Sequence, residues 1–448
     1  MKVTDFGDNF IWGASISAAQ TESAILLDGK AASIWDEFCN NRGRLFNRKN
    51  QIKNNHHIDQ SADFYFHYQQ DIDLLKSMGF KHFRFSISWS RVLPDGETVN
   101  EAGIDFYQRV IAYCHASGIE PWVTLYHWDL PAALEKKGGW TNRQILDWFE
   151  LYARLCVQSF PTVQYWMVLN EPSVFVGAGY FFGIHAPGKK GFTNFFKAMH
   201  HATLSIGHIY RIIKALNPTA KVGSTFSFTQ IESVDDSPKN VKAAYLADLL
   251  INRMFFEPLI GLGYPIAEFK KLKRIRDFFK EGDEALLAVP LDFIGIQNYT
   301  REVFRHNPFN PFLKIKQIPP EGRTKDLTAM KWEIHPPGIY NILHKINAYN
   351  TGIPLIITEN GIALDDQMKD GKVQDEKRVQ FFTAYLEQVA KAKNEGVDIQ
   401  GYFAWSLMDN FEWAEGYHPR FGLVYIDFES KRRVLKDSAL WFRNFLGQ

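Results

Sequence analysis

The segment PLIITENG, residues 354–361, is a short apolar run that ends in an acidic residue, an amide and a glycine. An apolar run of this length, rich in isoleucine and bounded by Pro354 and by polar residues, is typical of a buried strand. A longer stretch with helical periodicity follows at 376–394, and Gly396 comes shortly after it, as is common where a helix ends. The segment therefore predicts one buried strand followed by one helix.

The same unit recurs along the whole chain. Helical stretches are predicted at 62–78, 106–117, 144–159, 198–216, 376–394 and 437–445. Strand-like runs lie at 10–15, 82–87, 121–126, 165–169, 221–226, 293–297, 354–358 and 402–406. Eight strand-like runs that alternate with helical patterns, of which these six stretches are the clearest, predict the α/β class and a parallel sheet closed as a single (β/α)₈ TIM barrel.

Two connections are long for a compact domain: residues 29–59 and the proline-rich stretch 306–337. Long connections usually form functional lids or rims, so we expect long loops over the C-terminal face of the barrel. We find no linker, repeat or low-complexity tract, and we therefore predict that residues 1–448 form a single catalytic domain. A small subdomain over the barrel mouth is the alternative for the two insertions.

The composition excludes several classes of function. Lys+Arg number 51 and Asp+Glu 50, a net charge of +1 that argues against nucleic-acid binding through excess positive charge. Apolar residues make up 46% and charged residues 23%, as in an ordinary globular protein. No apolar run reaches the roughly 18 residues of a membrane span, and no signal peptide is evident, so the cytoplasm is expected. Three widely spaced cysteines suggest neither a disulfide framework nor a zinc site.

Polar and aromatic side chains collect where the predicted strands end, and barrels of this kind build their active sites there. Glu171 and Glu359, at the tips of the fourth and seventh strands, would face one mouth from nearly opposite sides. Two carboxyl groups so placed are what glycoside hydrolysis needs. Arg84 lies within the second strand, where a buried guanidinium needs a partner. The remaining tip residues are Gln20, His127, Trp128, Asn170, Asn298, Tyr299, Trp405, Glu412 and Trp413.

These segments together resemble glycoside hydrolase family 1, the β-glucosidase family, over essentially the whole chain. The resemblance rests on FIWGASISAAQTESA (10–24), TLYHWDLP (124–131), VLNEP (168–172), LIITENG (355–361) and WSLMDNFEWAEGYHPRFGLVYIDF (405–428), which occur in the family's order. The family implies a (β/α)₈ barrel and a retaining exo-acting β-glycosidase without a metal or other cofactor. Its substrates would be β-linked glucosides or related oligosaccharides and glycosides.

The resemblance also implies roles for individual residues. Glu171 is similar to the family's general acid/base and Glu359 to its nucleophile, which Arg84, Asn298 and Tyr299 would orient. Trp405 resembles the platform under the sugar ring, and Trp332 the stacking residue on the aglycone side. The residues that would bind the non-reducing sugar are Gln20, His127, Trp128, Asn170, Glu412 and Trp413.

Alternative functions are open at this point. A 6-phospho-β-glycosidase has a similar barrel and the same glutamate pair. An anionic Glu412 would repel its phosphate, however, and the segment Pro419-Arg420-Phe421-Gly422 stands where a lysine and a tyrosine would be sought. A non-catalytic sugar-binding relative usually lacks one carboxylate, whereas this chain keeps both. A barrel enzyme that uses a metal or a phosphate loop would need a ligand cluster or a glycine-rich loop. The preferred glycone, the aglycone and linkage, hydrolysis against transglycosylation, and the oligomeric state are not readable from the sequence.

Overall fold

The eight predicted strands form a closed parallel barrel in the computed structural model, which describes residues 1–40, 51–310 and 313–448. Neighbours around the barrel follow the chain order, and the last strand pairs with the first, so that Ser15 lies opposite Trp405. The barrel strands are β1 (Ile11–Ser15), β2 (His82–Ser86), β3 (Glu120–Tyr126), β4 (Tyr165–Asn170), β5 (Lys221–Ser227), β7 (Phe293–Gln297), β10 (Leu355–Asn360) and β11 (Ile399–Trp405). The (β/α)₈ prediction is confirmed, and the strand bounds differ from it by at most three residues.

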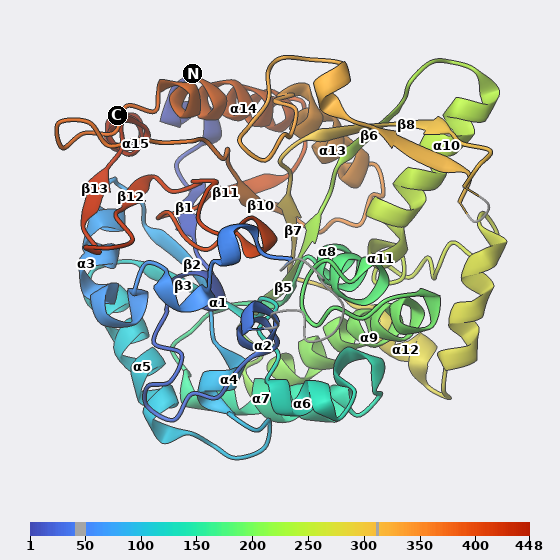
Figure 1. Ribbon diagram of the computed structural model, residues 1–448, viewed down its shortest axis with the longest axis horizontal. Helices are drawn as coiled ribbons and strands as arrows, with labels where there is room; N and C mark the ends of the chain where they lie inside the picture. The colour runs from blue at the N-terminus through green and yellow to red at the C-terminus, as the bar shows by residue number, and fades with distance from the viewer. Residues whose placement is uncertain (41–50, 311–312) are drawn as a thin grey trace.

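Helices surround the barrel, and the two chain ends lie close together (Figure 1). In α7 the buried side chains Ile145, Phe149, Tyr152 and Cys156 recur every three or four residues, so one face packs inward. The main helices are α3 (Phe64–Ser77), α5 (Glu101–Ala116), α7 (Ile145–Ser159), α9 (Phe192–Leu216), α10 (Pro238–Asp248), α13 (Pro337–Asn347), α14 (Glu376–Asn394) and α15 (Asp437–Leu446). Shorter ones are α1 (Ala18–Thr21), α2 (Ile34–Asn40), α4 (Trp89–Val92), α6 (Ala132–Lys136), α8 (Pro172–Val176), α11 (Met254–Phe256) and α12 (Asp283–Leu287).

Large side chains fill the inside of the barrel. Trp122, Met167, Phe293, Ile356 and Phe403 come from five different strands and form one buried cluster. The backbone makes room for it, because a Cβ on the β5 residue at position 223, a glycine, would lie 2.5 Å from the Phe293 ring. The barrel is therefore a packed core rather than a pore, and ligand space is left at its ends.

The long connections contain regular structure that the sequence did not indicate. Within the long connection 306–337 lies β9 (Ile315–Ile318), which pairs with β8 (Arg301–His306). Strand β6 (Gln230–Ser233) completes this three-stranded sheet, which lies beside α10 (Figure 1). A two-stranded sheet joins β12 (Val424–Ile426) and β13 (Arg433–Leu435). These strands have only three to six residues each, too few to show a clear period. Of the two long segments, residues 41–50 and 311–312 lie outside the described residues.

None of the helices in the described part of the chain combines the length and the apolar character of a membrane span.

Candidate active site

The two candidate carboxyl groups are both buried at the C-terminal ends of barrel strands. Glu359 is the second-last residue of β10 and is 3% exposed, whereas Glu171 follows β4 directly and is 7% exposed. Glu171 has a φ of 45°, a left-handed conformation that is uncommon for a residue with a side chain. Its N–H donates to the Thr225 carbonyl of β5 at 3.0 Å, and Pro172 opens α8 directly after it. The surrounding structure therefore holds Glu171 in an unusual conformation, as is frequent at functional sites.

Both oxygens of Glu359 are hydrogen-bonded by side chains from other strands. Nη1 of Arg84 donates to Oε1 at 2.5 Å, and the Tyr299 hydroxyl donates to Oε2 at 2.7 Å. Arg84 is fully buried, so its charge is poorly screened and favours the ionised carboxylate. The sequence indicated that the buried guanidinium of Arg84 needs a partner, and in the structure that partner is Glu359.

The surroundings of the two carboxyl groups shift their pKa values to different extents. Burial and the neighbouring charge of Glu359 raise the pKa of Glu171 well above its usual value. Burial also raises the pKa of Glu359, but Arg84 and Tyr299 oppose that rise. The pair can therefore hold one proton near neutral pH, with Glu171 as the protonated member and Glu359 as the charged one.

Asn170 is fixed in orientation by three donors to its side-chain oxygen. Nη2 of Arg84 donates at 2.5 Å, Nε2 of Gln297 at 2.8 Å and the Thr225 hydroxyl at 3.0 Å. The amide nitrogen is left to face Nε2 of His127 at 3.1 Å. Asn170 is thereby part of the same network as Arg84 and Glu359.

His127 is a neutral, fully buried ring beside that network. Burial, together with the charge of Arg84, lowers its pKa well below the usual value. Its Nδ1 atom has no hydrogen-bond partner among the described residues. A buried polar atom without a partner costs free energy, so His127 Nδ1 is placed to bind a polar group of a ligand.

Gln20 and Glu412 meet on the side of the mouth formed by the segment after β11. Nε2 of Gln20 donates to Oδ1 of Asn410 at 3.0 Å, to the Phe411 carbonyl at 2.9 Å and to Oε2 of Glu412 at 3.4 Å. Burial and the charge of Glu359 raise the pKa of Glu412 to about 8. A carboxyl with this pKa is mostly protonated at neutral pH, which weakens the expectation that an anionic Glu412 repels a phosphate.

Tryptophan rings form two walls of the mouth. Trp413 lies 4.5 Å from Trp128, ring centre to ring centre, and His127 lies 5.8 Å from Trp405. On the other side, Trp332 packs 5.5 Å from Tyr299, and its ring is half-buried. The Nε1 group of Trp128 donates to the Asn170 carbonyl at 2.9 Å, which leaves mainly its apolar face for other contacts.

Asn298 contacts Glu359 through the backbone only. Its N–H donates to the Glu359 carbonyl at 3.3 Å, and its side chain donates to the Phe228 carbonyl at 2.8 Å. The first bond joins the ends of β7 and β10, and the second joins the end of β7 to the residue after β5. The buried Oδ1 of Asn298 has no partner among the described residues and is free for a ligand.

Three residues of the site were not singled out from the sequence. Ser227, the last residue of β5, lies beside the Glu171 carboxyl, and its hydroxyl lowers the pKa of that group. Gln297 and Thr225 orient Asn170, as described above. The sequence signal for Ser227 is its place directly after the predicted fifth strand, 221–226.

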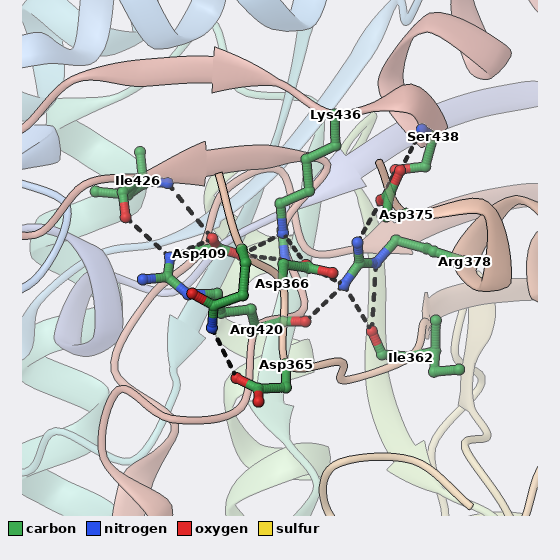
Figure 2. A network of polar contacts seen from close by, with 12 residues as sticks. Ile362, Asp365, Asp366, Asp375, Arg378, Asp409, Arg420, Ile426, Lys436 and Ser438 are labelled. Carbon is green, nitrogen blue, oxygen red and sulfur yellow. Dashed lines mark hydrogen bonds and ion pairs between the residues drawn. The ribbon is translucent and has the colours of Figure 1, made fainter. Parts of the chain in front are cut away.

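A buried ionic network fixes the segments that follow β10 and β11 (Figure 2). Nζ of Lys436 donates to Asp366 at 2.6 Å and to Asp409 at 2.7 Å, and all three side chains are almost fully buried. Arg378 donates to Asp366 at 2.7 Å and to the Arg420 carbonyl at 2.7 Å. Because both segments carry residues of the mouth, the network links their positions.

No group of three or more His, Cys, Asp or Glu side chains within residues 1–40, 51–310 and 313–448 is arranged to hold a metal ion.

Comparison with known proteins gives full-length matches. The sequence model of glycosyl hydrolase family 1 matches residues 2–448. Beta-glucosidase A of Thermotoga maritima is 37% identical over 450 residues, which cover 99% of this chain and 98% of that protein. A 6-phospho-beta-galactosidase of Clostridium acetobutylicum is 32% identical over 98% of this chain and 97% of its own. The solved structure of a beta-glucosidase from Thermotoga maritima in complex with deoxynojirimycin superimposes with a TM-score of 0.92 at 36% identity, covering 99% of each chain.

Proposed function

Since the chain belongs to glycosyl hydrolase family 1 and is a glycoside hydrolase, we propose that it is a retaining exo-β-glycosidase of the β-glucosidase type, with Glu359 as nucleophile and Glu171 as acid/base. The observation that carries this proposal is the unequal environment of the two carboxyls. Arg84 and Tyr299 hold the Glu359 carboxylate, while Glu171 has its pKa raised by burial and by Glu359. A charged nucleophile and a protonated acid are the pair that a retaining mechanism requires.

In the first step, a Glu359 oxygen forms a bond to the anomeric carbon while the bond to the leaving oxygen breaks. Glu171 gives its proton to that oxygen, so the leaving group departs as a neutral alcohol. The ester on Glu359 is uncharged, and the pKa of Glu171 therefore falls. In the second step, Glu171 takes a proton from water, the water oxygen bonds to the anomeric carbon, and the carboxylate of Glu359 is released.

The rest of the mouth would bind the sugar. The amide nitrogen of Asn170, which faces His127, would also bind the 2-hydroxyl, a contact that strengthens in the transition state. His127 has a buried nitrogen without a protein partner, and Gln20 and Glu412 lie together. Trp405 and Trp413 would contact the ring, and Trp332 the aglycone.

A 6-phospho-β-glycosidase is the second candidate, favoured by the 6-phospho-beta-galactosidase relative. With the pKa of Glu412 at about 8, charge repulsion by this residue is a weak argument against a phosphate. The stronger argument is the segment 419–422, where a lysine and a tyrosine would be sought for the phosphate. Its one cation, Arg420, is already ion-paired with Asp409 at 2.6 Å.

Substrate preference should separate the candidates. We expect p-nitrophenyl β-glucoside to be hydrolysed with a kcat/KM more than about 100-fold higher than that of its 6-phosphate, since desolvating an unpaired phosphate costs several kcal/mol. The panel also includes the galactoside and fucoside, each with and without the phosphate, and kcat/KM is measured from p-nitrophenol release. A preference for the phosphorylated members would move the assignment to the second candidate. Binding without any turnover would point to a non-catalytic sugar-binding protein.

A further inference from the structure

Tyr299 holds the Glu359 carboxylate, and a buried aromatic ring packs against Tyr299. The Phe421 ring lies edge-to-face with the Tyr299 ring at 5.9 Å, centre to centre, and the Trp332 ring lies 5.5 Å from it. Phe421 is 2% exposed, whereas Trp332 is only half-buried. Side chains in a close-packed interior have little room to move. Phe421 is therefore the more rigid of the two contacts that keep the Tyr299 ring in place.

Asp409 binds the residues on both sides of Phe421. Its Oδ2 atom accepts a hydrogen bond from Nη1 of Arg420 at 2.6 Å, and its Oδ1 atom accepts one from the Gly422 N–H at 3.0 Å. Asp409 is fully buried. One carboxylate thus holds both chain neighbours of Phe421, and the ring between them cannot shift without disturbing these bonds.

The backbone of the same segment is joined to the ends of two barrel strands. Arg420 exchanges backbone hydrogen bonds with Leu364, which follows β10, at 3.0 and 3.1 Å. The Arg420 carbonyl also accepts from Nη2 of Arg378 at 2.7 Å. The Phe421 carbonyl accepts from the N–H of Ser406, the residue directly after β11, at 3.3 Å. The position of Phe421 is therefore tied to the strand ends that carry the mouth.

Two cations compensate the charge of Asp409 (Figure 2). Nζ of Lys436 donates to Oδ1 at 2.7 Å, and Arg420 occupies Oδ2. A buried charge is tolerated only with such partners. An ionised carboxylate is acceptor-only, so both of its oxygens can accept at once, whereas an amide would turn a donor toward one of these groups. The pattern of bonds around Asp409 therefore requires the carboxylate.

We propose that Asp409 is a positioning residue for the nucleophile. It keeps the Phe421 ring against Tyr299, and the Tyr299 hydroxyl therefore stays on Glu359. This inference rests on the proposed function, because it takes Glu359 as the attacking group. It adds a role in catalysis for a carboxylate that is buried behind the mouth.

Phe421→Leu tests the ring contact and leaves the ionic network intact. Leucine is apolar but lacks the ring edge that meets Tyr299, so the Tyr299 hydroxyl should bind Glu359 less well. This hydroxyl lowers the pKa of Glu359, so the acidic limb of the kcat/KM profile should move up by about one pH unit. We expect kcat for p-nitrophenyl β-glucoside to fall by about tenfold, with the basic limb unchanged. An acidic limb that stays in place would overturn the proposal.

Asp409→Ala and Asp409→Asn test the tether itself. Alanine removes both bonds beside Phe421, whereas asparagine keeps one acceptor oxygen. The acidic limb should move in the same direction as in Phe421→Leu, and further for alanine than for asparagine. Unshifted limbs in both variants would remove Asp409 from the proposal. If Asp409→Ala does not fold, because Lys436 and Arg420 lose a buried partner, Asp409→Asn and Phe421→Leu decide the outcome.

Asp292→Asn is the matched control. Asp292 also accepts a backbone N–H, that of Val222 at 2.9 Å, and a lysine, Lys214 at 3.2 Å. It directly precedes β7, at the end of the barrel opposite to the mouth. The variant should lose thermal stability without moving the acidic limb. A limb that moves as far as in Asp409→Asn would make the shift an effect of lower stability and contradict the proposal.

A double-mutant cycle separates this inference from the proposed function. If Phe421 acts through Tyr299, Phe421→Leu should change kcat little in Tyr299→Phe, which lacks the hydroxyl. The effects of the two changes would then be strongly non-additive. Additive losses would overturn the inference and leave the proposed function intact. Full activity of Glu359→Ala would instead overturn the proposed function.

Discussion

Replacing Glu359 with alanine should lower kcat for p-nitrophenyl β-glucoside by at least about 10⁴-fold, the scale seen when a catalytic nucleophile is removed. The variant keeps the acid Glu171 but has no group to attack the anomeric carbon. Added azide or formate should restore turnover, because a small anion fits the space left by the carboxylate and lies beside Arg84. The anion attacks directly, so the product should have the α configuration, which NMR identifies.

Glu359→Gln is the matched control for this experiment. Its amide has nearly the size of the carboxylate and leaves no room for an anion, so we expect the same loss without rescue. Circular dichroism and thermal unfolding check that both variants fold, since either change leaves Arg84 without its charged partner. A rescued product with the β configuration would remove the nucleophile role from Glu359.

Replacing Glu171 with glutamine should separate substrates by the basicity of their leaving groups. General-acid assistance is typically worth about 10²–10⁴-fold, so kcat/KM for alkyl glucosides should fall by that factor. For 2,4-dinitrophenyl β-glucoside, whose leaving group needs no proton, kcat/KM should fall far less. Equal losses for both substrates would make Glu171 a binding residue.

The pH profile of the same variant gives an independent readout. The active form has Glu359 ionised and Glu171 protonated, so kcat/KM falls below the pKa of Glu359 and above that of Glu171. Burial raises both pKa values above 4.5, that of Glu171 further because Glu359 adds its charge. We expect a bell-shaped profile for wild type and loss of the basic limb alone in Glu171→Gln. A basic limb that survives in this variant would belong to another group, of which Glu412 is the first to examine.

The barrel could be predicted because its signal is strong and repeated. Each strand is a short apolar run followed by a helix, and 293–297 was predicted with the bounds of β7. The small sheet β6–β8–β9 could not be predicted in this way. Its strands are short and partly exposed, and they pair through contacts between distant segments.

The barrel pattern in the sequence predicts at which strand ends the site residues lie. It does not predict their hydrogen bonds or their pKa values. The sequence indicated that Arg84 needs a partner. Only the structure shows that Glu359 and Asn170 both accept hydrogen bonds from it. The raised pKa of Glu412 was not foreseen either, since the burial that causes it depends on how the segment after β11 folds. The single domain of residues 1–448 and the cytoplasmic location stay predictions from the sequence.

The ionic network around Lys436 could not be predicted from the sequence either. Lys436, Asp366 and Asp409 are far apart in the sequence and carry no motif that pairs them, yet they join two segments of the mouth. Buried ions of this kind depend on partners, and only the folded chain reveals which partners those are.

The central claim is that Glu359 attacks the anomeric carbon and forms a covalent glycosyl-enzyme with net retention. ¹H NMR of the first product formed from p-nitrophenyl β-glucoside, recorded before mutarotation, tests it most directly. Retaining enzymes have carboxyls about 5–5.5 Å apart, too close for a water to attack in place of the nucleophile. The account predicts that β-glucose forms first and the α anomer only later, at the rate of spontaneous mutarotation. Initial formation of α-glucose would contradict it, because only direct attack by water inverts the centre in a single step.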